Sequence, residues 1–259
     1  MSGTYPLLPI HRLGGIGLAL LRNEGKLKRY GGMIMLVKNW MNKEFYTLNV
    51  EDTMWDASRL MKEKGVQMVP VMKKNKLVGV LTDRDLKRAS ASDATALAIH
   101  ELLYLLTRIK IKEIMSKNPI TVPVDFTVAE AAEVLLHNKI SGAPVVDHEG
   151  KIVGTIDKDV LFKVLISLTG VEKRGIEFAF RLEDRPGSIK EVCDVIRKYG
   201  GRMASILTTY EGVPEGYRKA YIRMYNVERT KVPQIRNELS MKAPMLYMVD
   251  HRENKREIY

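Results

Sequence analysis

Residues 79–86 read Gly79-Val80-Leu81-Thr82-Asp83-Arg84-Asp85-Leu86, an apolar strand that runs directly into an acidic helix start. A second apolar run, residues 68–72, precedes it, and the polar residues 73–75 separate the two runs. Two apolar runs joined by polar turn residues predict a β-hairpin. Residues 68–86 therefore predict a strand, a turn, a second strand and the start of a helix, in that order.

This unit occurs twice in the chain. The segment that begins at Met41 recurs at Met115, an offset of 115 − 41 = 74 residues, and Thr53 falls on Thr127. Each of these threonines is followed three residues later by an acidic residue, which predicts a capping box at a helix start. Each copy therefore predicts the order strand, helix, strand, strand and helix, a βαββα repeat.

Two motifs make this tandem repeat resemble a pair of CBS domains, known as a Bateman module. They are residues 79–86 and, in the second copy, Ile140-Ser141-Gly142-Ala143-Pro144-Val145-Val146-Asp147. The insert between the copies, with a leucine-rich helix at 101–106, resembles that of bacterial AcuB-type (acetoin utilisation) CBS proteins, whose usual C-terminal partner is an ACT domain. The resemblance implies a regulatory homodimer that binds an adenosyl ligand.

The C-terminal part predicts a second, different domain. Strands are expected at 176–182, 203–209, 218–227 and 245–249, and helices at 188–199 and 233–240. That order is the ferredoxin-like βαββαβ arrangement. The entry to its first helix, residues 184–189, and Gly200-Gly201 resemble ACT domains. The fold class is therefore α+β, a CBS pair followed by an ACT-like domain.

The expected boundaries follow from these patterns. We predict a leader at 1–34, the first repeat at 35–90, a helical insert at 91–110, the second repeat at 111–170, the ACT-like domain at 174–250 and a tail at 251–259. The apolar run 13–21 is too short to span a bilayer. Its basic residues follow the run, unlike those of a signal peptide. We expect an unstructured leader, with translation starting at Met33 or Met35.

The CBS resemblance implies candidate ligand residues in both copies. In the first copy, Asp85 would accept the ribose hydroxyls, Thr82 and Arg84 would face the phosphate, and the adenine slot would comprise Thr47, Val66, Met68 and Pro70. The alternative is that Asp85 only caps its helix. The corresponding residues of the second copy are Thr121, Ile140, Ala143, Pro144, Asp157 and Asp159.

The second copy departs from the family pattern at the acidic position. Aligned without a gap, Asp157 takes the place of Thr82, and Val160 takes that of Asp85. Asp159 would supply the carboxylate if the register shifted by one residue. Otherwise this half is structural or binds a different ligand.

The ACT-like domain offers a second candidate site at a strand-to-helix turn. Its residues are Asp184, Arg185, Pro186, Gly187 and Ser188, which could receive an amino acid at the helix start. The alternative is an ordinary tight turn. An amino-acid sensor, with the CBS pair as a dimerisation scaffold, is therefore the competing hypothesis.

Charge and composition exclude several other classes of protein. The net charge of +11 is concentrated at the two ends, and no helix-turn-helix or zinc-finger spacing occurs, so nucleic acid is not expected as a partner. The single cysteine, Cys193, and five dispersed histidines predict neither a metal site nor a catalytic site. We expect a cytoplasmic regulator, not an enzyme, that requires no cofactor and contacts no membrane. Its expected partners are AMP, ADP, ATP or another adenosyl compound, and a regulated enzyme.

Overall fold

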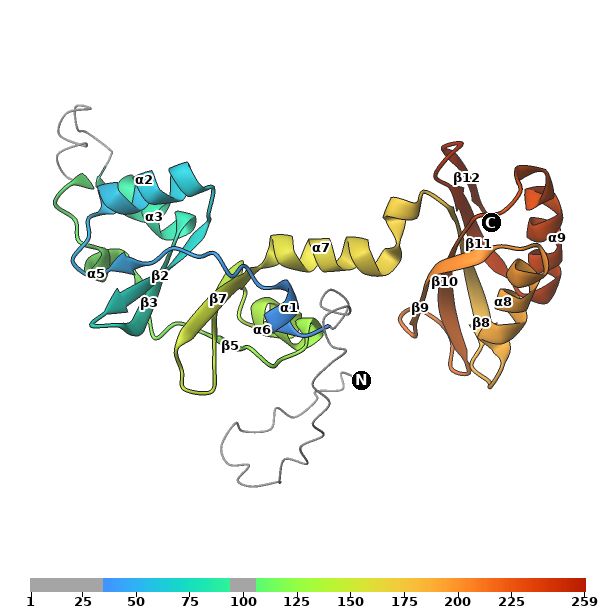
Figure 1. The fold of residues 1–259 in the computed structure, drawn as a ribbon, viewed down its shortest axis with the longest axis horizontal. Coiled ribbons are helices and arrows are strands. Elements are labelled where there is room, and N and C mark those ends of the chain that lie inside the picture. The colour runs from blue at the N-terminus through green and yellow to red at the C-terminus, as the bar shows by residue number, and fades with distance from the viewer. Residues whose placement is uncertain (1–34, 94–105) are drawn as a thin grey trace, which may run out of the picture. The chain divides into compact units, whose positions relative to one another are not determined.

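The computed structural model describes residues 35–93 and 106–259, and Figure 1 shows their fold. The predicted leader and most of the predicted insert helix lie outside the described residues. The two repeats have the expected order of elements. The first comprises β1 (Leu48–Asn49), α2 (Met54–Lys64), β2 (Met68–Lys73), β3 (Lys76–Thr82) and α3 (Asp83–Asp93). The second comprises β5 (Val122–Pro123), α6 (Val128–His137), β6 (Gly142–Val146), β7 (Ile152–Asp157) and α7 (Lys158–Thr169).

Both predicted capping boxes are present. The Thr53 hydroxyl accepts a hydrogen bond from the backbone N–H of Asp56, and the Asp56 carboxylate accepts one from the backbone N–H of Thr53. Thr127 and Glu130 form the same pair at the start of α6. Each box satisfies N–H groups that the first helical turn leaves without partners. The apolar stripe behind each cap is buried in the core of its own repeat.

The two repeats exchange their entry segments. Helix α1 (Val37–Trp40) precedes the first repeat, yet Val37 is buried in the core of the second. Conversely, α5 (Ile111–Ile114) buries Ile111 in the first repeat, and β4 (Ser116–Lys117) pairs with β3. The predicted boundaries at 35 and 111 therefore fall in segments that pack on the other repeat. Sequence order alone could not show this, because the pairing is long-range.

At each place where an entry segment packs on the other repeat, the strand that it contacts contains a glycine. A Cβ atom on Gly79 would lie 2.7 Å from Met115 Sδ, and one on Gly154 would lie 2.8 Å from the backbone oxygen of Asn42. Both distances are too short for a real side chain. Leu77-Val78-Gly79 and Ile152-Val153-Gly154 thus end in glycine because the entry segment of the other repeat passes over the strand.

The C-terminal domain has the predicted βαββαβ order with one further strand. Its five-stranded antiparallel sheet has the order β12-β11-β8-β10-β9. Helices α8 and α9 pack on one face of the sheet (Figure 1) over Phe178, Phe180 and Ile222. The elements are η2 (Val171–Lys173), β8 (Ile176–Glu183), α8 (Ser188–Lys198), β9 (Arg202–Thr209), β10 (Tyr217–Tyr225), η3 (Arg229–Lys231), α9 (Val232–Lys242), β11 (Met245–Asp250) and β12 (Lys255–Ile258).

The C-terminal end of the chain corrects the prediction of a tail at 251–259. Residues Lys255–Ile258 form β12, an edge strand that pairs antiparallel with β11. The sequence of β12 is mostly charged and lacks the apolar alternation by which strands are predicted. Its pairing with β11 and a group of ion pairs hold it instead.

Candidate functional site

A cleft of 860 Å³ lies between the two repeats. One wall consists of residues 41–46, which lead into β1, and residues 64–68, which join α2 to β2. The other wall consists of Ser141 and Gly142 with the end of β7 and the first turns of α7. Because both repeats contribute walls, a ligand here would contact both at once.

Aromatic side chains lie on both walls of the cleft. Phe45 and Tyr46 come from the segment before β1, and Phe162 comes from α7. Tyr46 is 37% exposed and Phe162 is 58% exposed, so both have ring surface free for contact. The Lys64 ammonium lies 5.1 Å from the centre of the Tyr46 ring. Exposed aromatic rings offer flat surfaces on which a planar base can stack.

Two aspartates near the start of α7 have different surroundings. The Asp157 carboxylate accepts hydrogen bonds from Asn42 Nδ2 at 3.0 Å and from the Val160 backbone N–H at 2.9 Å, so it caps α7. Asp159 also lines the cleft but is exposed, and it makes no hydrogen bond or ion pair to another described residue. Asp159 is therefore the carboxylate of α7 that is available to a ligand.

Asp85 has the geometry of a helix cap. It is 5% exposed, and its carboxylate accepts hydrogen bonds from the Thr82 backbone N–H at 3.0 Å and the Thr82 hydroxyl at 2.6 Å. Arg88 donates to the other carboxylate oxygen at 2.7 Å. Neither Asp85 nor Thr82 lines the cleft. A ribose would have to displace these contacts in order to reach Asp85.

The structure brings together only some of the residues predicted from the CBS resemblance. Val66 and Met68, predicted to act with Asp85, line the same cleft as Asp157 and Asp159 of the other repeat. The remaining predicted residues lie outside the cleft: Thr47, Pro70, Thr82, Arg84, Asp85, Thr121, Ile140, Ala143 and Pro144. Pro70, Ala143 and Pro144 are buried in strands, where they pack.

Sequence reasoning missed several residues of the cleft. Phe45 and Tyr46 directly precede Thr47, and four lysines, Lys43, Lys64, Lys158 and Lys163, also line the cleft. The aromatic pair was visible in the sequence as two adjacent rings before a strand. Which residues would face them depended on the exchange of entry segments.

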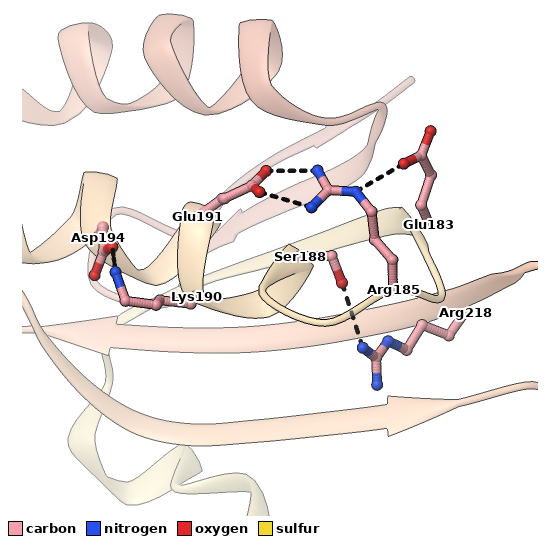
Figure 2. Close-up of polar contacts among 7 residues, drawn as sticks. All are labelled: Glu183, Arg185, Ser188, Lys190, Glu191, Asp194 and Arg218. Atoms are coloured by element: carbon pink, nitrogen blue, oxygen red, sulfur yellow. Dashed lines mark hydrogen bonds and ion pairs between the residues drawn. The ribbon is translucent and has the colours of Figure 1, made fainter.

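In the C-terminal domain, two of the predicted ligand residues, Arg185 and Ser188, make side-chain hydrogen bonds to neighbouring residues. Figure 2 shows the Arg185 guanidinium donating two hydrogen bonds to Glu191, at 2.8 and 2.9 Å, and one to Glu183 at 2.9 Å. This pairing holds the pKa of Glu191 below its usual range. Buried Ser188 accepts a hydrogen bond from Arg218 at 3.3 Å. Arg185 is therefore not free to receive a carboxylate.

The other residues of this turn are exposed. Asp184 lies 3.5 Å from Arg218 and accepts a long hydrogen bond from Tyr210. Pro186 and Gly187 complete the turn, and Gly187 has a φ of +90°, which favours glycine. A small pocket of 250 Å³ beside the turn includes Arg185 and Ser188 but not Asp184, Pro186 or Gly187.

Three further features concern the described residues: the thiol of Cys193, clusters of metal-ligating side chains, and membrane-spanning helices. Cys193 is buried in the core of the C-terminal domain, and burial raises the pKa of its thiol. Within residues 35–93 and 106–259, no three His, Cys, Asp or Glu side chains cluster in the way that a metal site requires. No helix in that part is long and apolar enough to cross a membrane.

Comparison with known proteins identifies the family. The model of the CBS domain matches residues 37–92 and 111–167. A CBS domain-containing protein of Dictyostelium discoideum is 31% identical over 137 residues, which are 52% of this chain and 94% of that protein. The chain belongs to the CBS-domain family. The two repeats are thus a CBS pair, and the cleft lies between its two CBS domains.

Two further proteins are similar to part of this chain. An inosine-5'-monophosphate dehydrogenase of Korarchaeum cryptofilum is 31% identical over 156 residues, which are 59% of this chain but only 29% of that enzyme. The CBS domain pair of protein MJ0100, solved in complex with 5'-methylthioadenosine and S-adenosyl-L-methionine, is 26% identical. That likeness covers 50% of this chain and 98% of the solved chain, with a TM-score of 0.43.

Proposed function

We propose that this protein is a regulatory sensor that binds an adenine nucleotide or a related adenosyl ligand in the cleft of its CBS pair. The observation that carries the proposal is the 860 Å³ cleft, which is lined by aromatic rings from both repeats and by the Asp159 carboxylate. The rings suit a purine base, and the Asp159 carboxylate suits the two ribose hydroxyls as a hydrogen-bond acceptor. The CBS resemblance implies the same class of ligand.

The proposal assigns the ribose to Asp159 instead of Asp85. Asp159 lies in the cleft without a partner among the described residues, whereas Asp85 is held by Thr82 and Arg88. Val66 and Met68, predicted to form the adenine slot, face the cleft in agreement with this assignment. A site around Asp85 would need a local rearrangement of its helix cap.

Isothermal titration of the full chain with AMP and ATP tests the proposal. We expect binding by the wild-type protein and at least tenfold weaker binding by Asp159→Asn, because loss of a hydrogen bond to a charged acceptor costs about 1.5–3 kcal/mol. Asp125→Asn is the matched control, since Asp125 is exposed and outside the cleft. Unchanged affinity in Asp159→Asn, with loss of binding in Asp85→Asn, would move the site to the first helix cap.

The regulatory step is proposed to act through the packing of two subunits. The described surface that supports a homodimer is α7, which exposes the large apolar side chains of Phe162, Leu165, Ile166 and Leu168. Phe162 belongs to both this surface and the cleft. A ligand that contacts Phe162 would therefore alter the surface through which two copies pair. The altered pairing would in turn change how the protein binds an enzyme partner.

The alternative function is amino-acid sensing by an ACT-like C-terminal domain. The βαββαβ order and the 250 Å³ pocket favour it, because Arg181 and Lys242 line that pocket without an ion pair to another described residue. Thermal unfolding with the twenty amino acids tests it. A stabilising amino acid whose effect disappears in Arg181→Gln would make the C-terminal domain the sensor.

A further inference from the structure

Helices α8 and α9 cover one face of the C-terminal sheet (Figure 1), where Ile222 of β10 is buried in the core. Side chains of a strand alternate between the two faces of a sheet, so the neighbours of Ile222 along β10 lie on the opposite face. We call this opposite face the open face. From β10 it carries tyrosines and basic residues in alternation: Tyr217, Lys219, Tyr221, Arg223 and Tyr225. One strand thus presents three aromatic rings with basic side chains between them.

The tyrosine rings of the open face have exposed surface. Tyr217 is 38% exposed, and Tyr221 and Tyr225 are half-buried. Tyr247 of β11 lies on the same face, and the centre of its ring is 6.3 Å from that of Tyr221. These two rings meet across β8 because the residue opposite both of them is Ala179, whose side chain is small. The open face therefore offers several flat rings on which planar groups can stack.

Basic side chains flank these rings. The Arg181 guanidinium lies 5.8 Å from the centre of the Tyr217 ring, and the Lys173 ammonium lies 5.7 Å from that of Tyr225. Arg202 of β9 lies opposite Tyr225 in the sheet. Four basic residues around the rings form no ion pair with another described residue: Lys173, Arg181, Arg202 and Lys219. Their charges are therefore available to an anionic partner.

The acidic side chains of the open face are already engaged. Glu177 forms an ion pair with Arg223 and accepts a hydrogen bond from the Tyr247 hydroxyl at 2.6 Å. Glu183 accepts a hydrogen bond from Arg185 at 2.9 Å. A second copy of the open face would bring like charges together, which disfavours the pairing of two such faces. The occupant that complements the open face is therefore anionic.

We infer that the open face binds single-stranded RNA, whose bases stack on the tyrosine rings and whose phosphates contact the flanking basic side chains. Base stacking on aromatic rings tolerates any sequence, and RNA-recognition domains stack two or three bases on the aromatic side chains of a four-stranded sheet. A duplex keeps its bases paired and stacked, and an acidic peptide supplies negative charge without a planar base at each repeat. Neither matches both the rings and the charges.

The tyrosine hydroxyl groups favour RNA over DNA. Those of Tyr217, Tyr221 and Tyr225 make no hydrogen bond to another described residue, so they are available to the 2′-hydroxyl groups of RNA. The sequence-based expectation that nucleic acid is not a partner rested on the lack of a helix-turn-helix or zinc-finger spacing. Those motifs read the grooves of a DNA duplex, whereas stacking on a sheet needs neither of them.

Fluorescence anisotropy of the full chain with a dye-labelled single-stranded RNA tests the inference. The RNA has about twelve nucleotides, within the roughly 4–16 that one single-strand-binding domain covers. We expect saturable binding that weakens at least about tenfold when KCl is raised from 0.05 to 0.2 M, because each contacted phosphate contributes about −0.7 to the slope of log affinity against log salt. Duplex RNA of the same length should bind at least about tenfold more weakly.

Two double variants assign the binding to the open face. Tyr217→Leu with Tyr221→Leu removes two rings and keeps apolar side chains, so it should weaken RNA binding at least about tenfold without changing the salt slope. Arg202→Gln with Lys219→Gln should reduce the magnitude of the salt slope by about 1.4.

The matched controls make the same kinds of change on α8, on the covered side of the sheet. They are Tyr199→Leu, at the end of the helix, and Arg197→Gln with Lys198→Gln in its last turn. Each should change RNA affinity by less than about twofold. Circular dichroism of all four variants verifies that they fold.

The remaining outcomes would overturn the inference. RNA binding that is unchanged in both open-face variants would place the RNA site elsewhere on the chain. Polyglutamate that displaces the RNA at equal charge concentration would show a surface for any polyanion. DNA of the same sequence that binds as tightly as the RNA would remove the assignment to RNA. Absence of binding to the labelled RNA would leave the open face without this function.

Discussion

Gly154 occupies the point where the entry segment of the first CBS domain crosses the second. A Cβ atom there would lie 2.8 Å from both Asn42 O and Met41 Sδ. We predict that Gly154→Ala lowers the free energy of unfolding by about 1–3 kcal/mol, because overpacking forces the crossing segment to shift. Urea unfolding measures the change. Lys151→Ala, exposed on the same hairpin, is the control and should change it by less than about 0.5 kcal/mol.

Arg223 is a buried charged residue of the C-terminal domain, only 3% exposed. It pairs with Glu177, and its Nε donates to the backbone oxygen of Thr169, at the end of α7, at 2.8 Å. Arg223→Met would leave Glu177 without this counterion. We predict a loss of about 3 kcal/mol in urea unfolding, against less than about 1 kcal/mol for exposed Arg197→Met. Equal losses in the two variants would contradict this account of Arg223.

Residues with local roles could be predicted from the sequence, and residues with long-range roles could not. Thr53 and Thr127 were predicted as caps, because a capping box involves only four consecutive residues. Which aspartate faces Val66 and Met68 depends on how two distant segments cross. The aspartate of the clearer motif, Asp85, caps a helix outside the cleft, whereas Asp159 of the second copy lines the cleft.

At the scale of elements, β12 shows how charges can hold a strand that the sequence pattern does not predict. Lys255 lies 2.8 Å and Arg236 3.0 Å from the carboxylate oxygens of Glu257. Hydrogen bonds from Lys255, Tyr259 and Arg236 lower the pKa of Glu257 to about 2. The ordinary value is 4.5. A carboxylate with a lowered folded-state pKa stabilises the fold above its unfolded pKa, and the benefit is lost as pH falls between these values.

We therefore predict a pH-dependent effect of Glu257→Gln. At pH 6 the wild-type protein should melt at a higher temperature than the variant, and the difference should shrink between about pH 4.5 and pH 2. Melting curves of both proteins across this range measure it, and their difference cancels the titration of all other groups. A difference that stays constant from pH 6 to pH 2 would show that Glu257 does not hold β12 through its charge.

Helix α7 links three features of the chain. Its first turns line the cleft, its middle exposes apolar side chains, and the carbonyl of its last residue, Thr169, accepts hydrogen bonds from Ser205 and Arg223 of the C-terminal sheet. The sequence predicted this helix as the last element of the second repeat. It did not predict the exposure of the apolar face, because amphipathic spacing does not show which apolar residues are left uncovered.

At the scale of the whole molecule, the proposed homodimer can be tested through α7. Leu165 is 55% exposed on this helix. We predict that the wild-type chain has twice the mass of one chain in size-exclusion chromatography with light scattering, and that Leu165→Glu has the mass of one chain, since a buried charge disfavours an apolar interface. Met241→Glu, at an exposed position of α9, should remain a dimer. A dimeric Leu165→Glu protein would exclude α7 from the interface.

Photoaffinity labelling of the full chain with 8-azido-ATP, followed by peptide mapping, locates the segments that contact a bound nucleotide. If the nucleotide binds in the cleft, labels are expected in residues 41–46 or 64–68 and in the α7 segment, with competition by unlabelled ATP. Competable labels confined to residues around Asp85, or to the C-terminal domain, would contradict it.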